Sequence, residues 1–328
     1  MARKSQVSVL GRFQETVKRA GLLPEGAKVL VAVSGGADSV CLFDLLRAVA
    51  PGLGLELVGF HMNHGLRPTA SRDERFVRGV FEFRLVVVRS DVAAYSRSHG
   101  LGIEEAARTL RYRNMERVAS KYNCDRIALG HTADDNLETM LLNLARGAGL
   151  SGISGIPVRR GPYVRPLIDI EREQIVRYLR ARRLSWVEDE TNQDPRFRRN
   201  LLRLQAVPAL KAVNPEAAGN ARRAAALLRE EDEFMETLAT EALSRVARVG
   251  KTRASVDCAA FENYNPVLKR RMVRHLLPGL DSDGIAKAVR FLRQGPDQTL
   301  LLSRSVRLVR QGRVVRLGIP GKEVQDGR

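Results

Sequence analysis

The stretch Val29–Leu42 reads VLVAVSGGADSVCL, and it decides the fold because an apolar run ends at a polar turn just before an apolar helical pattern begins. The run Val29–Val33 predicts a short buried strand, and the spacing of apolar residues over Asp38–Ala50 predicts a helix. Between them, Gly35 and Gly36 permit backbone conformations and close approaches that a Cβ would block. Several backbone N–H groups can therefore point toward one anion at the N-terminus of the helix.

Asp38 is the residue that a simple phosphate-binding turn does not explain, because a carboxylate repels a bare phosphate. A magnesium ion between the carboxylate and a polyphosphate removes this conflict, and Ser34 and Ser39 add hydroxyl donors. We therefore interpret the turn as a pyrophosphate cradle with Asp38 as its magnesium ligand. The alternative is an ordinary glycine-rich turn capped by Ser and Asp. Neither GxxxxGK(S/T) nor GxGxxG occurs at an expected strand end, which excludes the ordinary P-loop and the dinucleotide fingerprint.

Strand-like and helix-like segments alternate from Lys28 to about Asp189. This pattern predicts an α/β fold with a Rossmann-like parallel sheet, helices on both faces, and the carboxyl ends of the strands along one edge, where ligands bind. The expected strands are Val29–Val33, Leu55–His61, Leu85–Arg89 and Arg126–Gly130, and the expected helices are Asp38–Ala50, Ser71–Phe83, Ile103–Tyr122 and Thr132–Ala145.

A second domain is expected after Asn214, beyond a polar, arginine-rich segment that ends the alternation. Pro215–Val249 has the apolar stripe of a long helix, Pro266–Leu277 is helical, and Thr299–Leu317 is strand-like. We therefore expect residues 1–214 to form a catalytic, nucleotide-binding domain and residues 215–328 to form a smaller α-rich accessory domain.

The charge of the chain indicates a polyanionic partner. Lys and Arg number 55 against 37 Asp and Glu, for a net charge of +18 and a pI near 10.6. A nucleic acid is the simplest such partner, although a generally basic composition is the alternative. Aromatic residues are only 5% of the chain, which favours phosphate contacts to a folded RNA or a duplex over stacking on long single strands.

Other global features predict a cytoplasmic protein without a membrane partner. No apolar run reaches the length of a membrane span, and the basic N-terminus is not followed by the apolar segment of a secretory signal. Cys41, Cys124 and Cys258 are far apart and form no CxxC pair, so neither a disulfide framework nor a structural zinc site is expected.

Two stretches besides the turn carry polar side chains near expected strand and helix ends. HMNHGLR, His61–Arg67, is either a loop with solvated histidines or an edge loop beside a nucleotide, with Arg67 facing phosphate. Zinc is not expected there, because a third ligand is lacking nearby. Helical spacing places Arg108, Arg111 and Tyr112 on one ridge, which is either a solvated basic face or an anion site.

The third stretch is GHTADDNLETMLLNLARGAGLSG at Gly130–Gly152, where acidic residues gather at the start of a helix. Helical spacing places His131, Asp134, Asp135 and Glu138 within one arc, opposite the apolar side chains. Capping and the helix dipole, with Thr132 as N-cap, explain one or two of these acids but explain Glu138 poorly. Three carboxylates beside a polyphosphate site need a cation, which is either magnesium or a cationic substrate.

These stretches together resemble a known family. SGGADS looks like the PP-loop of the N-type ATP pyrophosphatases, which cleave ATP between the α and β phosphates and leave AMP on a substrate oxygen. Combined with HMNHGLR, with EAARTLRY at Glu105–Tyr112 and with HTADDNLET, it is similar to the tRNA(Ile)-lysidine synthetases. The later VEDETNQDPRFRRNLLR, Val187–Arg203, is also similar to that family. The resemblance covers most of the first expected domain and, more weakly, the second, and it implies that residues 215–328 bind the tRNA.

The resemblance implies a C–N bond-forming ligase that uses ATP with Mg²⁺. Its substrates would be L-lysine and the isoleucine tRNA with a CAU anticodon, and a homodimer is left open. ATP would adenylate the C2 oxygen of the wobble cytidine and release pyrophosphate; the lysine ε-amine would then attack C2 and expel AMP. The product, lysidine, pairs with A rather than G.

The resemblance also implies roles for particular residues of this chain. The catalytic residues would be Asp38, Asp135 and Glu138, with Asp38 also the magnesium ligand. ATP would contact Ser34, Gly35, Gly36, Ala37, Asp38, Ser39, His61, Met62 and Arg67. Lysine would contact Asp134, Asp135 and Glu138. The tRNA would contact Arg108, Arg111, Arg196, Arg198 and Arg199.

Two other functions remain as alternatives. A PP-loop tRNA thiolase that relies on an iron–sulfur cluster or a persulfide needs paired cysteines, whereas Cys41 and Cys124 are better interpreted as core residues. A nucleotide-dependent RNA-binding adaptor without chemistry gains nothing from clustered carboxylates. GMP and NAD synthetases would not need this basic charge.

Overall fold

The computed structural model describes residues 8–65, 70–81, 83–188, 198–250, 253–293, 298–302 and 306–318. The chain divides into two compact units, Met1–Leu228 and Arg229–Arg328. The long helix α11, Ala217–Val246, contributes to both units. The domain boundary expected at residue 214 stays a prediction.

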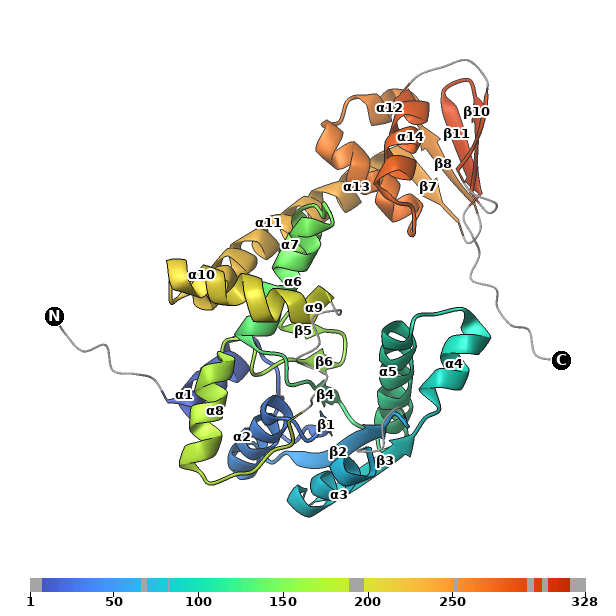
Figure 1. Ribbon diagram of the computed structural model, residues 1–328. Coiled ribbons are helices and arrows are strands. Elements are labelled where there is room, and N and C mark those ends of the chain that lie inside the picture. The colour runs from blue at the N-terminus through green and yellow to red at the C-terminus, as the bar shows by residue number, and fades with distance from the viewer. Residues whose placement is uncertain are drawn as a thin grey trace. The chain divides into compact units, whose positions relative to one another are not determined.

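The first unit is built around a six-stranded sheet in the order β3-β2-β1-β4-β6-β5 (Figure 1). Neighbouring strands are parallel except for β5 and β6, which are antiparallel. The strands are β1 Lys28–Ala32, β2 Glu56–Asn63, β3 Arg84–Arg89, β4 Arg126–Ala128, β5 Arg159–Arg160 and β6 Tyr163–Val164. The predicted parallel α/β fold is confirmed, and β1 lies between β2 and β4 with the Ser34–Ser39 turn at its carboxyl end.

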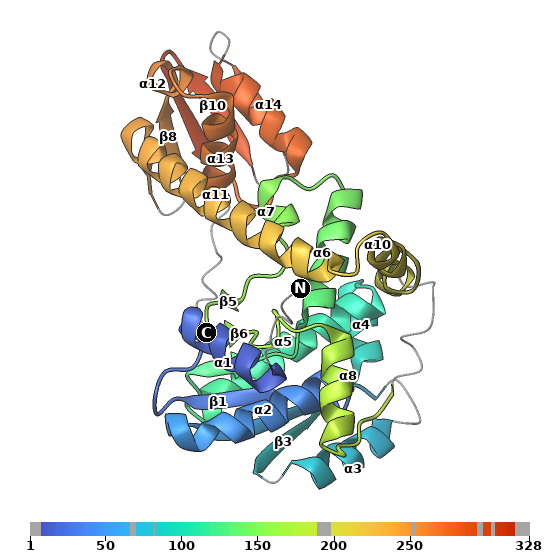
Figure 2. The same ribbon diagram turned by 90° about the vertical axis from the view of Figure 1, so that its left-hand side faces the viewer.

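Helices cover both faces of this sheet, which explains why β1 is apolar at every position of its centre. Side chains alternate along a strand, so Val29 and Val31 enter one core with α1, α2, α3 and α8, whereas Leu30 enters a second core with α4 and α5 (Figures 1 and 2). These helices are α1 Val9–Arg19, α2 Ala37–Leu53, α3 Ala70–Val80, α4 Val92–His99, α5 Ile103–Lys121 and α8 Arg172–Ala181.

The acidic helix and a later arginine-rich segment pack against each other in this unit. Helix α6, Ala133–Ala145, begins after the N-cap Thr132, as the sequence predicts. Beside it lie α9 (Arg198–Leu201), the π-helical turn η2 (Leu202–Ala206) and α10 (Val207–Val213). Ala133 and Leu137 of α6 share a small core with Val207 and Ala218. The short helix α7, Leu150–Ile153, follows α6.

The second unit combines helices with an antiparallel sheet in the order β7-β8-β11-β10-β9. Its strands are β7 Ala247–Val249, β8 Arg253–Asp257, β9 Thr299–Leu301, β10 Arg307–Gln311 and β11 Val314–Gly318, and its helices are α12 Cys258–Glu262, α13 Pro266–Leu276 and α14 Ser282–Arg293. Phe261, Met272 and Leu292 are fully buried between the helices and one face of the sheet. The strand-like pattern predicted over Thr299–Leu317 corresponds to β9, β10 and β11.

Candidate functional site

The Ser34–Ser39 turn connects β1 to α2 and is held in shape by the hydroxyl of Ser39. The Ser39 Oγ accepts hydrogen bonds from the N–H groups of Ser34 and Gly35, at 3.2 Å each, and donates to the Gly36 carbonyl at 2.9 Å. Gly35 has a φ of +92°, and a Cβ there would lie 3.3 Å from the nearest side-chain atom of α3. The positive φ favours glycine, and any larger residue would also have to displace Val77 slightly.

Asp38 follows the buried residue Ala37 in the first turn of α2, with its side chain 23% exposed. Its Oδ2 accepts a hydrogen bond from Arg172 Nη1 at 2.6 Å, while its Oδ1 is buried without a hydrogen-bond partner among the described residues. Burial raises the pKa of Asp38 to about 6, against the lowering effect of the Arg172 guanidinium. A buried carboxylate oxygen without a partner is suited to receive a cation.

The carboxyl end of β2 turns its side chains inward. The His61 ring is buried, and its Nδ1 lies 2.8 Å from the Val33 carbonyl, which ties β2 to the start of the turn. Met62 is buried in the core beneath α5. The resemblance implies that both residues contact the nucleotide; in this structure their side chains pack inside the protein beside the turn. Arg67 lies outside the described residues.

Three acids of α6 lie side by side and are largely shielded from solvent. Asp135 completes a capping box, because its Oδ2 accepts hydrogen bonds from the N–H and the hydroxyl of Thr132 at 2.8 and 2.9 Å. Asp134 Oδ2 accepts a hydrogen bond from the Arg172 N–H at 2.7 Å, and Glu138 is only 1% exposed. Arg172 thus links Asp38 at the turn to Asp134 on α6, so the predicted nucleotide and amine sites adjoin.

Cations from the α9–η2–α10 segment hold the remaining oxygens of these acids. Arg199 bonds Asp135 and Glu138 at 2.8 and 2.7 Å, and Arg203 bonds the same pair at 3.3 and 2.7 Å. Lys211 bonds Asp134 at 2.6 Å. Arg203, Lys211 and Arg172 are site residues that the sequence pattern does not indicate. The sequence feature that could have associated Arg203 with Arg199 is their i, i+4 spacing, since residues four apart lie on the same face of a helix.

His131 lies next to this cluster at the end of β4. Its Nδ1 is buried and lacks a hydrogen-bond partner among the described residues. Burial lowers the pKa of His131 to about 4, with Asp135 opposing this and the cations Arg165, Arg199 and Arg108 adding to it. The imidazole is therefore neutral at pH 7 and offers a nitrogen for a hydrogen bond in a positively charged corner of the site.

The predicted RNA-binding arginines are only partly brought together. Arg108 is exposed on α5 and lies over the Tyr112 ring, 5.1 Å from its centroid, whereas Arg111 is exposed one turn later. Arg198 is exposed at the start of α9, while the adjacent Arg199 turns to the acids. Arg196 lies outside the described residues.

Comparisons with known proteins identify the family of the chain. Residues 6–210 match the family model described as a PP-loop domain, which is the class that the first unit defines. The chain is 31% identical to the tRNA(Ile)-lysidine synthase of Geobacillus kaustophilus over 92% of its own length and 69% of that protein. It is also 31% identical to that of Caldanaerobacter subterraneus subsp. tengcongensis, over 82% of this chain and 58% of the relative. The chain belongs to the tRNA(Ile)-lysidine synthase family.

The similar proteins differ in how much of their length this chain covers. The chain spans about three fifths of the length of several curated relatives that it matches. Among solved structures, the U34-tRNA thiolase NcsA from Methanococcus maripaludis with its [4Fe-4S] cluster is similar with a TM-score of 0.57 and 17% identity, over 67% of this chain and 78% of that one. That likeness concerns the fold. Within the described residues, none of the helices has the length and apolar character to cross a membrane.

Proposed function

We propose that the protein ligates L-lysine to C2 of the wobble cytidine of a tRNA(Ile) with a CAU anticodon, with ATP cleaved to AMP and pyrophosphate. The observation that carries this proposal is the bridge of Arg172 between Asp38 and Asp134, at 2.6 and 2.7 Å. It joins the glycine turn, which is suited to a polyphosphate, to an acidic helix, which is suited to an amine. Membership of the lysidine synthase family supports the identity of both substrates.

The first step requires an anion site and a cation for the departing pyrophosphate. The backbone N–H groups of the turn and the N-terminus of α2 would orient the triphosphate. The described residues contain no group of three His, Cys, Asp or Glu side chains that could hold a metal ion by themselves. Magnesium commonly uses one or two carboxylates and completes its shell with phosphates and water. Asp38, through its unpartnered Oδ1, would hold it together with the nucleotide, and the ion would neutralise charge on the leaving pyrophosphate.

The second step requires a neutral amine next to C2. In the first step the C2 oxygen bonds to the α-phosphorus as the bond to pyrophosphate breaks; in the second the lysine Nε bonds to C2 as the bond from C2 to the AMP oxygen breaks. Asp135 and Glu138 would bind the lysine ammonium and accept its proton. Because Arg199 and Arg203 hold both carboxylates in this structure, lysine would take the place of one guanidinium.

The deciding experiment is the mass of the wobble nucleoside after unmodified tRNA(Ile) is incubated with the protein, ATP and isotope-labelled lysine. We expect the mass of lysidine with the label, together with stoichiometric AMP and pyrophosphate. In Glu138→Gln, we expect a higher KM for lysine or a slower second step while adenylation persists. Unlabelled nucleoside from active, folded protein would refute the proposal.

The same assay distinguishes the two alternatives. A tRNA thiolase would show no dependence on lysine, and a nucleotide-dependent adaptor would release neither AMP nor pyrophosphate. The cysteines speak against a cluster-dependent thiolase, because Cys41 and Cys124 belong to cores on opposite faces of the sheet. Burial also raises the thiol pKa of both, to about 11 for Cys124, which disfavours the reactive thiolate.

A further inference from the structure

Arg172 joins the glycine turn to the acidic helix, and its two contacts are of different kinds. Its backbone N–H donates to Asp134 Oδ2 at 2.7 Å, whereas its side-chain Nη1 donates to Asp38 Oδ2 at 2.6 Å. The capping box of Glu171 with Gln174 also holds the main chain at the start of α8. The backbone of Arg172 is therefore fixed by several contacts, while its side chain is held at a single carboxylate.

Most of the hydrogen-bonding capacity of the Arg172 side chain is unused in this structure. A guanidinium has several N–H donors, yet Asp38 is the only carboxylate with which Arg172 pairs among the described residues. The Arg172 side chain is also 39% exposed. The guanidinium can therefore turn toward a ligand at the start of α2 without a change in the backbone and without the loss of a second partner.

The charge of Asp38 explains why the chain itself supplies a cation at the turn. Asp38 Oδ1 is buried without a hydrogen-bond partner among the described residues, so the carboxylate depends on Arg172 for its compensation. A buried carboxylate without a counter-ion destabilises the fold. A metal ion held by Asp38 would take over this compensation. The guanidinium would then be repelled by the metal and attracted by the phosphates bound beside it.

We propose that Arg172 exchanges Asp38 for the β and γ phosphates of ATP, and that it thereby binds the pyrophosphate that leaves in the first step. This inference rests on the proposed function for the identity of the nucleotide. The planar fork of a guanidinium bonds two phosphate oxygens at once, which suits Arg172 to this role. The exchange frees Asp38 for the metal. It leaves the backbone contact with Asp134 intact, so the acids of α6 stay in place.

The first test is the binding of ATP and of AMP with Mg²⁺ by the full chain, measured by isothermal titration calorimetry without tRNA. AMP lacks the two phosphates that Arg172 binds. We expect Arg172→Gln to weaken ATP binding about tenfold or more, through the loss of charge-assisted hydrogen bonds, and AMP binding less than about twofold. Arg172→Lys, which keeps the charge without the fork, should lie between. Circular dichroism should show that both variants are folded.

The opposite result has an equally clear meaning. Unchanged or tighter ATP binding by Arg172→Gln would overturn the inference, since Arg172 would then act only as the counter-ion of Asp38. An equal loss of ATP and AMP affinity would overturn it too, because the contact would not be with the β and γ phosphates.

The exchange itself is tested by ATP binding in EDTA, where Asp38 holds no metal. Asp38 and ATP then compete for one guanidinium, so Asp38→Asn should bind metal-free ATP about tenfold more tightly than the wild-type protein. Because Asp38→Asn also removes a charge that repels ATP, Asp38→Asn/Arg172→Gln separates the two effects. We expect the double variant to lose the gain. A gain that persists without Arg172 would refute the exchange.

The matched control is Arg182→Gln, which changes the C-cap residue of α8. Arg182 Nε lies 2.9 Å from Oδ2 of Asp44, a buried aspartate of α2 that lies about 9 Å along the helix from Asp38. We expect this variant to lose stability in urea, as Arg172→Gln does, but to keep its ATP affinity within about twofold. Equal losses of ATP affinity would contradict the inference, because they would indicate that pairing between α2 and α8 determines binding.

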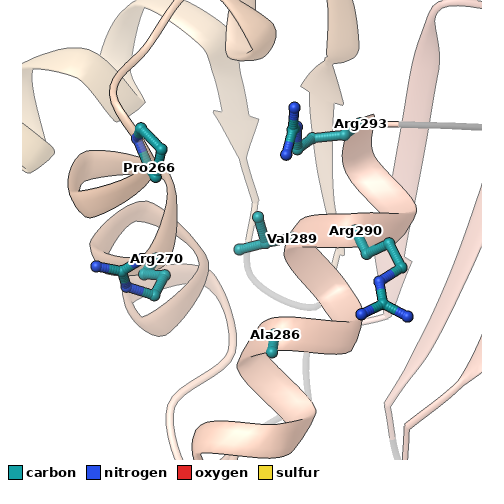
Figure 3. A pocket seen from close by; sticks show the side chains of 6 residues that line it. All are labelled: Pro266, Arg270, Ala286, Val289, Arg290 and Arg293. Carbon is teal, nitrogen blue, oxygen red and sulfur yellow. The ribbon is translucent and has the colours of Figure 1, made fainter.

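A second control tests for a general effect of positive charge. Arg270, Arg290 and Arg293 line a pocket of about 330 Å³ between α13 and α14 of the second unit (Figure 3). Guanidinium groups at such a surface also attract phosphates. We expect Arg270→Gln/Arg290→Gln to keep its ATP affinity within about twofold. A loss as large as that of Arg172→Gln would overturn the inference.

Failure of this inference is distinguishable from failure of the proposed function, because the binding tests use neither tRNA nor lysine. If the wild-type protein forms lysidine but Arg172→Gln binds ATP normally, only the role of Arg172 is wrong. If Arg172→Gln loses ATP affinity as expected but the wild-type protein forms no lysidine, only the proposed reaction is wrong.

Discussion

Replacing Glu138 by glutamine tests whether the acids of α6 also support the fold. The Glu138 carboxylate is 1% exposed and accepts three hydrogen bonds: from Arg199 Nε at 2.7 Å, and from Arg203 Nε and Nη2 at 2.7 and 3.1 Å. Glutamine has the same shape but offers one oxygen and one NH₂ group. One guanidinium would therefore face a donor instead of an acceptor, and the negative charge between the two cations would be absent.

The magnitude follows from the burial of the groups that remain. Removing one partner of a buried ion pair destabilises a protein by about 3–5 kcal/mol, because the other charge is left without compensation. Here the side chains of Arg199 and Arg203 are 39% and 26% exposed, so water can solvate them in part. We therefore expect Glu138→Gln to lower the free energy of unfolding by about 2 kcal/mol. Arg199→Gln/Arg203→Gln should cost more, about 3–5 kcal/mol, because it strands the buried carboxylate.

The assay is urea denaturation at pH 7.5 without substrates, followed by tryptophan fluorescence. The chain has one tryptophan, Trp186, which packs at the edge of the core of the first unit, so the signal reports that unit. The control is Glu216→Gln, because Glu216 is 71% exposed and pairs at 3.6 Å with an exposed Arg223; its effect should stay below about 0.5 kcal/mol.

The triple variant with all three changes decides the reasoning. If the losses arise from the ion pairs, the triple variant should lose about 1–3 kcal/mol less unfolding free energy than Glu138→Gln and Arg199→Gln/Arg203→Gln lose together. That difference is the interaction energy of residues in one network. A change below 0.5 kcal/mol in Glu138→Gln, or strict additivity in the triple variant, would refute the argument that the cations are present to balance the acids.

Three further predictions concern the turn and its surroundings. Asp38→Ala should abolish pyrophosphate release in an ATP cleavage assay, because it removes the proposed magnesium ligand; normal turnover would exclude that role. Gly35→Ala should weaken ATP binding and lower stability by about 1–3 kcal/mol, since φ is +92° and Val77 is close; unchanged calorimetric affinity would contradict this. Glu74, whose pKa is lowered to about 2 by hydrogen bonds from Arg89, Asn63 and Arg78, stabilises the fold above pH 4.5 and loses this effect as pH falls toward 2. With its arginine partners exposed, Glu74→Gln should cost about 1 kcal/mol at pH 7 and little near pH 2 by urea titration; an equal cost at both would exclude the ionic explanation.

The strand, turn and helix around Asp38 could be predicted because each is determined by neighbours in the sequence. The apolar run, the glycines and the helical spacing specify them locally, and the same holds for Thr132 as the N-cap of α6. The orientation of His61 was not predictable in the same way. An imidazole at a strand end can point to solvent or to the core, and here the Val33 carbonyl of the neighbouring segment selects the core.

The partners of the acids could not be predicted because they depend on contacts between segments far apart in the chain. Glu138 meets Arg199 and Arg203 across 61 and 65 residues, and Asp134 meets Lys211 across 77. Between them, the chain forms β6 and α8 before it returns to α6. The π-helical turn η2, which carries Arg203, is also invisible to a pattern of period 3.6.

The contacts of Asp134, Asp135 and Glu138 with cations of the same chain change what these acids imply about the substrate. Clustered carboxylates need a cation, since a buried charge without compensation is costly. Asp38 and the three acids of α6 are balanced by Arg172, Arg199, Arg203 and Lys211, so the chain supplies that cation itself. The Arg172 bridge places the acids of α6 beside the glycine turn, and membership of the family supports lysine as the amine. An ammonium that replaces a guanidinium leaves the charge of the site unchanged. The acids can thus stay buried and compensated without substrate and still be available to an amine that competes for them.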